Sequence, residues 1–232
     1  MDMVISQTDP RYLDAAMRYA RILEQRNRLL RDGAADHALF EAIDFQLDAA
    51  AAYISARRHE WTAELRDIFS LYYKAISGSD EEPGLTLVSH TGPGCPALAD
   101  LLRERFSRDS AVRHTTAGPH RDDLEMTLDG MPVRRTASQG QCKTFTIALR
   151  LAQYGFLSRA CGMSPLLLLD DIFDKLDAGR VGRIISTVGA DTFGQIFITD
   201  TNRRHLDEIV AFMGADHRLW SVEHGRFSVI DG

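Results

Sequence analysis

The chain has 232 residues, enough for one large domain or two small ones with a real hydrophobic core. Hydrophobic residues make up 44% of the chain and charged residues 26%, which is ordinary globular composition. The net charge of −6 excludes a global basic field that would attract nucleic acid, so any such binding would need a local patch.

The cysteines and the N-terminus bear on the cellular compartment. Cys95, Cys142 and Cys161 form no Cys-x-x-Cys pair, and their odd number argues against a disulfide framework. No apolar run is long enough to span a membrane, and the first ten residues do not resemble a signal peptide. These features predict a cytoplasmic protein with no membrane partner.

Two long helical patterns come first along the chain. Residues 12–33 carry apolar side chains on one stripe, and residues 37–77 run without Gly or Pro, which favours one continuous helix. A turn of a few residues between long helices implies an antiparallel hairpin. We therefore expect a helical arm at residues 1–78, with an ordinary helical domain as the alternative.

An acidic break that contains Pro and Gly, at residues 77–84, marks the boundary to a second domain at residues 79–232. There, strand and helix patterns alternate, which predicts an α/β fold with a mainly parallel core sheet. Two of the strands are short and apolar, as in a buried parallel sheet. Strands are expected at residues 85–90, 124–128, 131–135, 165–170 and 195–199, a closing hairpin at 218–230, and helices at 95–107, 141–160, 178–190 and 203–213.

The stretch ASQGQCKTF, residues 137–145, superficially matches a phosphate-binding P-loop. A P-loop needs Gly-x-x-x-x-Gly-Lys-Ser/Thr, in which glycine amides wrap the phosphates. Here Cys142 precedes Lys143, and no lysine in the sequence follows a glycine. The sequence therefore contains no P-loop.

The same stretch opens a predicted helix. Ser138 is a good N-terminal cap, and Gly140 lets a ligand approach the backbone. The first amides of a helix bind anions through their N–H groups and the helix dipole. The pattern indicates either an anion site at Ser138, Gln139, Gly140 and Gln141, or a helix cap and nothing more.

Four leucines lead into Asp170 and Asp171, at the C-terminal end of a predicted strand. Ligands usually bind at this edge of a parallel sheet. Asp170 could hold Mg²⁺, which prefers few carboxylates plus phosphate oxygens, and Asp171 could orient or deprotonate a water molecule. The alternative is a pair of solvated acids in a turn, which continues through Asp174, Lys175 and Asp177.

Two further polar stretches each have more than one interpretation. The strand at residues 195–199 ends at Thr199, which would face the same crevice as Asp170 if the two strands are neighbours. His205, one turn into the next helix, is more often a structural residue. Residues 118–122, Gly-Pro-His-Arg-Asp, form either a structural hydrogen-bond network or a functional cluster.

Taken together, these stretches resemble the ABC-type ATPases, and within them the RecF family of bacterial DNA replication and repair proteins. The likeness runs from about Ile5 to Gly232 through the motifs ISQTDPRYLDAAMRYARILEQRN, GPHRDDLEM, ASQGQCKTFTIALRLA, LLLLDDIFDKLD and IFITDTN. It implies that Ser138–Gln141 is the signature motif, Asp170 the Walker B aspartate and Asp171 the catalytic carboxylate. Asp177 would belong to the D-loop, and Thr199 would occupy the switch position.

The resemblance also implies a mechanism. Two ATPase heads would dimerise around ATP and Mg²⁺, with the signature helix of one head capping the nucleotide held by the other. DNA would lie across the paired heads and arms, and other recombination mediator proteins would be partners. Phosphate contacts would come from arginines of the arm: Arg26, Arg28, Arg31, Arg57 and Arg58.

Two departures from the family pattern matter. The P-loop of the family lies toward its N-terminus, so the sequence resembles a C-terminal portion that should not hydrolyse ATP by itself. The catalytic position carries Asp171 where transporters have Glu, which suggests a slow hydrolase. The alternatives are the head of another SMC-like ATPase, a metal-dependent nuclease or phosphatase that uses Asp170 and Asp171, and a module that only binds DNA or recombination partners.

Overall fold

The computed structural model describes the whole chain except residues 35, 173–175, 190–192, 202–206, 208–209, 211–216 and 231–232. Nearly all of the helix expected at 203–213, together with Asp174, Lys175 and His205, therefore lies outside the described residues.

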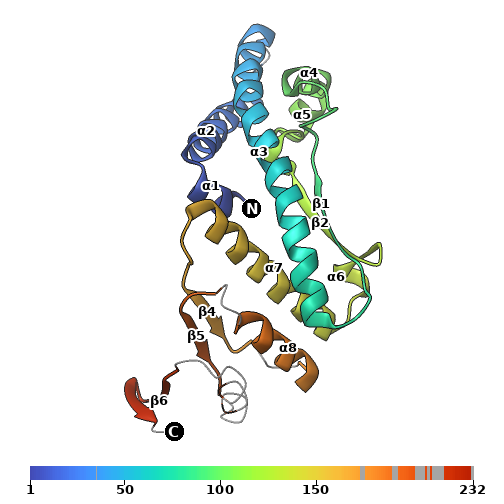
Figure 1. Ribbon diagram of the computed structural model, residues 1–232. Coiled ribbons are helices and arrows are strands. Elements are labelled where there is room, and N and C mark those ends of the chain that lie inside the picture. Colours follow the sequence, from blue (N-terminus) through green and yellow to red (C-terminus); the bar gives the residue numbers. More distant parts are fainter. Residues whose placement is uncertain are drawn as a thin grey trace.

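The arm consists of two long antiparallel helices, as predicted (Figure 1). Helix α2 (Pro10–Asp32) begins two residues earlier than expected, because Pro10 occupies its first turn and the Asp9 side chain accepts a hydrogen bond from the Tyr12 amide. Helix α3 (His37–Ser77) is continuous over 41 residues and ends at Gly78 in the left-handed conformation. A short helix that the sequence did not predict, α1 (Asp2–Thr8), packs beside α2 and α7.

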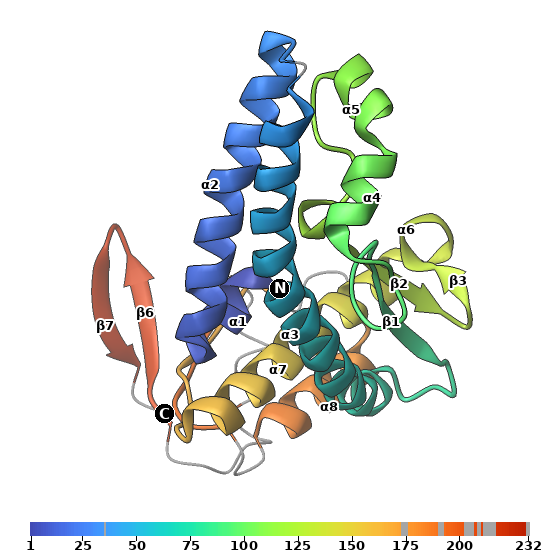
Figure 2. The ribbon, with the colours of Figure 1, turned by 90° about the horizontal axis from the view of Figure 1, so that it is seen from above.

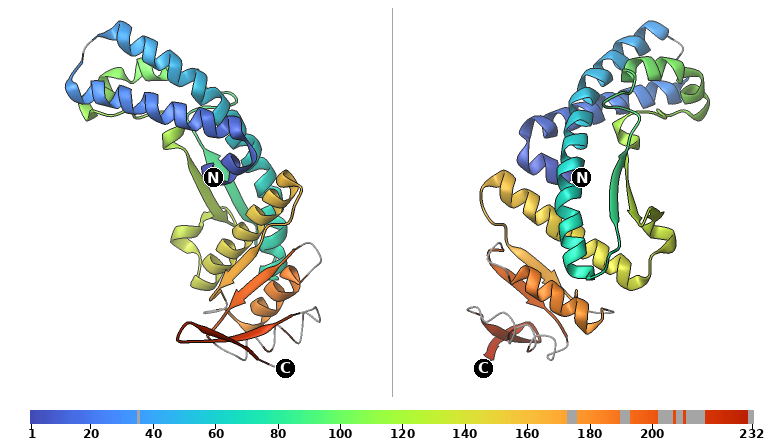
Figure 3. Two further views of the ribbon diagram at one scale, coloured as in Figure 1. Left: turned by 90° about the vertical axis from the view of Figure 1, so that its left-hand side faces the viewer. Right: turned by 45° about the vertical axis from the view of Figure 1, so that its right-hand side comes forward.

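Helix α3 belongs to both the arm and the body. One half lies along α2, and the other half packs against α7 (Gln139–Cys161), α8 (Ala178–Val188) and the first strand (Figures 1 and 3). One continuous hydrophobic core includes Leu47 of the arm and Leu65, Phe145 and Ile184 of the body. The boundary expected near residue 78 stays a prediction, since α3 links the two parts.

A three-stranded antiparallel sheet follows α3. Strands β1 (Pro83–Val88) and β2 (Asp123–Leu128) pair along their whole length, and β2 turns through Asp129 and Gly130 into β3 (Met131–Pro132). Both turn residues have positive φ, as the Asp-Gly pattern predicted. The second strand of this hairpin stops after two residues because Pro132 cannot donate to the ladder, and α6 (Val133–Thr136) begins directly after it.

Between β1 and β2, the sequence predicted a single helix at residues 95–107, but the structure has two short helices in this region. Helices α4 (Leu98–Glu104) and α5 (Phe106–Val112) are separated at Arg105 and lie beside the end of the arm (Figure 2). A single turn of 3₁₀ helix, η1 (Pro119–Arg121), then leads into β2.

The parallel part of the α/β fold is the pair β4 (Leu167–Asp170) and β5 (Ile196–Thr199). Leu167 and Leu169 are buried, whereas Leu168 on the opposite face is 70% exposed. The expectation of a fully buried strand therefore holds for one face only. A final antiparallel hairpin, β6 (Leu219–Glu223) and β7 (Arg226–Ile230), lies at the opposite end of the molecule from the arm tip (Figures 1 and 3).

Candidate functional site

The N-terminus of α7 is closed by a reciprocal capping box. The Ser138 hydroxyl oxygen accepts a hydrogen bond from the Gln141 amide at 3.2 Å, and the Gln141 Oε1 accepts one from the Ser138 amide at 2.7 Å. The amides of Gln139 and Gly140 belong to the same first turn, where backbone N–H groups have no acceptor within the helix. The predicted cap is therefore present, and an anion site at this helix end stays a prediction.

A carboxylate outside the predicted site residues, that of Glu81, holds the Gln141 side chain. Glu81, in the loop between α3 and β1, accepts a hydrogen bond from Gln141 Nε2 at 2.7 Å. It also accepts from the Tyr73 hydroxyl at 2.8 Å and from Ser79 Oγ at 2.9 Å. Burial alone would raise the pKa of Glu81, but these hydrogen bonds and the nearby charge of Arg180 hold it below its usual value.

Arg180, on α8, also lies against the capping turn. A Cβ atom added to Gly140 would stand 2.5 Å from Arg180 Nη1, so a larger residue here would require the Arg180 side chain to shift. The space that we expected Gly140 to leave for a ligand is thus occupied by Arg180 in this structure. Arg180 was not among the predicted residues, because its approach depends on how α8 packs.

Arg180 also connects this turn to Asp177. Asp177 caps α8 by accepting from the Arg180 amide at 2.9 Å, and its other carboxylate oxygen lies 3.5 Å from Arg180 Nε. The hydrogen bond from the Arg180 backbone is the main reason that the pKa of Asp177 is lowered. The predicted signature and D-loop residues are therefore joined through one arginine.

The second predicted site lies at the C-terminal edge of β4 and β5. Asp170 and Thr199 are direct partners in the parallel register, which confirms that the two strands are neighbours. The Thr199 hydroxyl donates to Asp170 Oδ1, and the Asp171 amide donates to the Thr199 carbonyl at 3.1 Å. Asp171 adopts φ of 47°, an uncommon left-handed conformation for a non-glycine residue that is often associated with functional turns.

The donor set at this edge suits Mg²⁺ in combination with phosphate. Asp170 offers a carboxylate at an exposed position, with the Thr199 hydroxyl beside it. Mg²⁺ in phosphate-transfer sites takes one or two carboxylates and completes its shell with water and phosphate oxygens. Within the described residues, no group of three His, Cys, Asp or Glu side chains is placed so that it could hold a metal ion by itself.

Two of the arginines expected to contact DNA are buried, and this contradicts the expectation for them. Arg26 is fully buried and bonded to Asp44 at 2.6 Å, Asp109 at 2.7 Å and Thr115 at 2.9 Å. Arg58 is likewise buried and donates to Asp2 and Asp122. Neither guanidinium group can reach a phosphate, since each is enclosed by its own partners.

The other three arginines remain at the surface. Arg28 and Arg31 are exposed on α2, and Arg28 lies 4.0 Å from Asp32. Arg57 is paired with Asp9 at 2.9 Å and with Glu60. Contact between Arg28 or Arg31 and DNA stays a prediction, while Arg57 would have to exchange its carboxylate partners for a phosphate.

Residues 118–122 form a structural hydrogen-bond network, one of the two alternatives. His120 Nδ1 lies 2.8 Å from the Tyr19 hydroxyl and its Nε2 lies 3.1 Å from the Thr115 carbonyl. Asp122 accepts from Arg58 at 2.6 Å. Burial is the main cause that lowers the pKa of His120, which favours the neutral ring.

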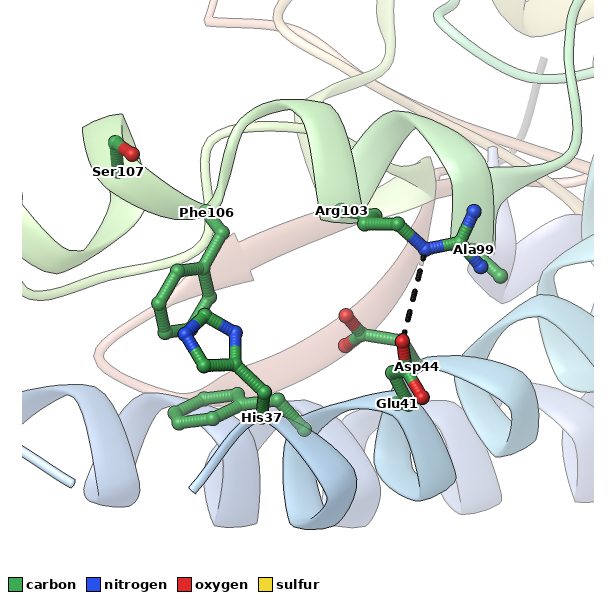
Figure 4. Close-up of a pocket in the computed structure, with 8 residues that line it drawn as sticks. His37, Glu41, Asp44, Ala99, Arg103, Phe106 and Ser107 are labelled. Atoms are coloured by element: carbon green, nitrogen blue, oxygen red, sulfur yellow. Dashed lines mark ion pairs between the residues drawn. The ribbon is translucent and has the colours of Figure 1, made fainter. Parts of the chain in front are cut away.

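A separate pocket of about 210 Å³ lies between α3 and the α4–α5 pair (Figure 4). His37, Phe40 and Phe106 form its aromatic side, and Glu41 lies 3.9 Å from Arg103 across it. Its lining includes none of the site residues predicted from the sequence.

In the parts of the chain that the structure describes, no helix has the length and apolar character needed to cross a membrane.

No protein-family model matches the chain. Two curated relatives, each named DNA replication and repair protein RecF, are similar to nearly all of it. The protein from Parabacteroides distasonis is 46% identical over 225 residues, which are 97% of this chain and 61% of the relative. The protein from Bacteroides fragilis is 44% identical over 232 residues, which are 100% of this chain and 62% of the relative. The chain thus spans less than two thirds of the length of these curated relatives.

Solved structures show the same fold. The structure titled recombination mediator protein RecF-ATPrS in the RecFOR pathway matches with a TM-score of 0.80 at 24% identity, over 99% of this chain and 62% of that one. The corresponding RecF-ATP structure matches with a TM-score of 0.78 at 23% identity. Over the part of these proteins that it spans, the chain therefore matches the RecF family in sequence, and it shares the fold of the solved RecF structures.

Proposed function

We propose that this chain supplies the nucleotide-capping half of an ATP-dependent DNA-repair clamp. The observation that carries the proposal is the capping box of Ser138 and Gln141 at the start of α7. Its exposed hydroxyl and first-turn amides would contact the γ-phosphate of an ATP molecule held by a second head. ATP would then stabilise the dimer of heads, because it binds the associated state better than the separated one.

The C-terminal edge of β4 and β5 would act on the nucleotide that is bound to the same head. Asp170, oriented by the Thr199 hydroxyl, would hold Mg²⁺, which when bound neutralises charge on the transferred phosphoryl group. Asp171 would orient the attacking water molecule and accept its proton. The hydrogen bond from the Asp171 amide to the Thr199 carbonyl supports this role, since it fixes the backbone of Asp171 to the neighbouring strand.

Binding of DNA and of other recombination mediator proteins is part of the same proposal. The matched structures are titled as a recombination mediator in the RecFOR pathway, and the relatives are named for DNA replication and repair. In this chain, Arg28 and Arg31 offer exposed positive charge on one helix of the arm. Because such contacts release counterions, binding through them would weaken as the salt concentration rises.

The capping role predicts a specific effect of Ser138→Arg. In a longer protein that also contains the region which the curated relatives have beyond this chain, the bulky cation should abolish ATP-dependent dimerisation. Nucleotide binding by the monomer should stay near normal, because the cap serves the other subunit. Analytical ultracentrifugation with and without ATP measures the first property, and a nucleotide titration of the monomer measures the second.

The matched control is Thr146→Arg, an exposed position on the same helix whose hydroxyl donates to the Cys142 carbonyl. It should leave ATP-dependent dimerisation intact. Loss of monomer nucleotide binding in Ser138→Arg would show instead that Ser138 acts on the nucleotide of its own head.

The present chain, tested alone, should bind nucleotide poorly, because it has no P-loop. Calorimetric titration with millimolar ATP and Mg²⁺ measures this affinity. Micromolar binding would contradict the assignment of Ser138–Gln141 as a cap that acts only together with another head. Cleavage of DNA by this chain with a divalent metal would favour a nuclease instead.

A further inference from the structure

The loop between α3 and β1 places one carboxylate between the arm helix and the capping turn. Glu81 accepts from three donors: Tyr73 on α3, Ser79 in the loop and Gln141 on α7. Tyr73 is fully buried and its ring lies 5.8 Å from that of Phe145 on α7. Glu81 is therefore held in place from the α3 side and meets the capping turn from there.

The contact fixes which way the Gln141 amide faces. A carboxylate can only accept hydrogen bonds, so it must face the Nε2 end of the Gln141 amide. That leaves Oε1 to accept from the Ser138 amide, as the capping box requires. Without Glu81, the Gln141 amide would lose the partner that selects this orientation, and the cap of Ser138 would lose half of its reciprocal bonding.

We propose that Glu81 is a positioning residue that sets the capping geometry of Ser138 and Gln141 and ties it to the long helix of the arm. The inference rests on the proposed function, because the capping turn is taken to be the γ-phosphate contact. Glu81 itself does not touch the nucleotide. Arg180, which lies beside Gly140, offsets the negative charge that Glu81 brings close to an anion site.

The first experiment uses the present chain and needs no nucleotide. Hydrogen exchange of the backbone amides in residues 139–144 is compared between the wild type, Glu81→Ala and Glu82→Ala. Glu82 is the matched control, since it is adjacent and exposed and its carboxylate pairs with Lys74 at 2.6 Å. Glu81→Ala should speed exchange in this turn about five- to tenfold, as expected for loss of one net hydrogen bond, while Glu82→Ala should not.

Rescue by a conservative variant separates positioning from general stability. Glu81→Gln keeps an oxygen that can accept from Gln141 Nε2, so its exchange in residues 139–144 should lie closer to the wild type than that of Glu81→Ala. Equal exchange in Glu81→Ala and Glu82→Ala, or a Gln variant that behaves like Ala, would overturn the proposal.

The second experiment uses the longer protein that also contains the region which the curated relatives have beyond this chain. Glu81→Ala should weaken ATP-dependent dimerisation about tenfold and leave the affinity of the monomer for ATP unchanged. In the background of Gln141→Ala, the same change should have almost no further effect, because Glu81 acts through Gln141. Additive losses would overturn the proposal.

Failure of this inference can be told from failure of the proposed function. If Ser138→Arg leaves dimerisation intact, the proposed function fails, whereas the exchange experiment on the present chain still tests the geometry. If Ser138→Arg abolishes dimerisation but Glu81→Ala does not weaken it, the proposed function stands and the role of Glu81 is refuted.

Discussion

Replacing Arg26 with alanine should destabilise this protein far more than any surface arginine change. The Arg26 side chain is fully buried, and its nitrogen atoms lie 2.6 Å from Asp44 and 2.7 Å from Asp109. Alanine would leave two enclosed carboxylates without their cation. Breaking a buried ion pair in this way costs about 3 to 5 kcal/mol, which is a large share of the stability of a typical domain.

The matched control is Arg28→Ala, two residues away on the same helix. The Arg28 side chain is 79% exposed and lies 4.0 Å from Asp32, so its loss should change the free energy of unfolding by less than about 0.5 kcal/mol. Urea unfolding at pH 7, followed by circular dichroism, measures both variants. A cost below about 1 kcal/mol for Arg26→Ala would refute the view that Arg26 serves the fold.

The same variant has a predicted pH dependence. In the wild type, burial is the main cause that raises the pKa of Asp44, against the opposing effect of Arg26. A raised carboxyl pKa in the folded state means that folding favours the protonated form, so stability from this group declines as the pH rises through the folded pKa. Removal of Arg26 should raise the pKa of Asp44 further, and the stability deficit of Arg26→Ala should therefore shrink as the pH is lowered from 7 toward 5.

Two other changes test the packing that surrounds the site. Gly118 has φ of 121°, and an added Cβ would stand 2.4 Å from the Tyr19 hydroxyl, so Gly118→Ala should lower the free energy of unfolding by about 1 to 3 kcal/mol; an unchanged urea midpoint would contradict this. Asp9→Ala should cost about 1 kcal/mol because it removes the cap of α2. Burial would raise the pKa of Asp9, but hydrogen bonds from Tyr12, Tyr53 and Arg57 lower it, so the stabilisation exists above the unfolded pKa and is lost as the pH falls through the folded pKa. Unfolding measured between pH 3 and 7 should show a shallower acid loss in Asp9→Ala than in the wild type, and parallel curves would count against the role of Asp9.

Local sequence patterns determined much of the architecture. A run of residues without Gly or Pro predicted α3 over its whole length, and Asp129–Gly130 predicted the turn of a hairpin. Ser138, directly ahead of a helical pattern, predicted a helix cap, because a serine hydroxyl can accept from the free amides of the first turn. The motif order also indicated the family.

Only the tertiary structure decided which charged side chains are available to a ligand. Arg26 and Arg28 look alike in the sequence, yet one is enclosed by Asp44 and Asp109, which come from other helices, and the other faces solvent. The roles of Glu81 and Arg180 at the capping turn likewise depend on contacts with residues about 40 to 60 positions away in the chain. Short-range patterns determine helices and turns, whereas burial and charge pairing depend on which distant elements pack together. For this reason the sequence located the capping turn but not Glu81 and Arg180, the residues that contact it.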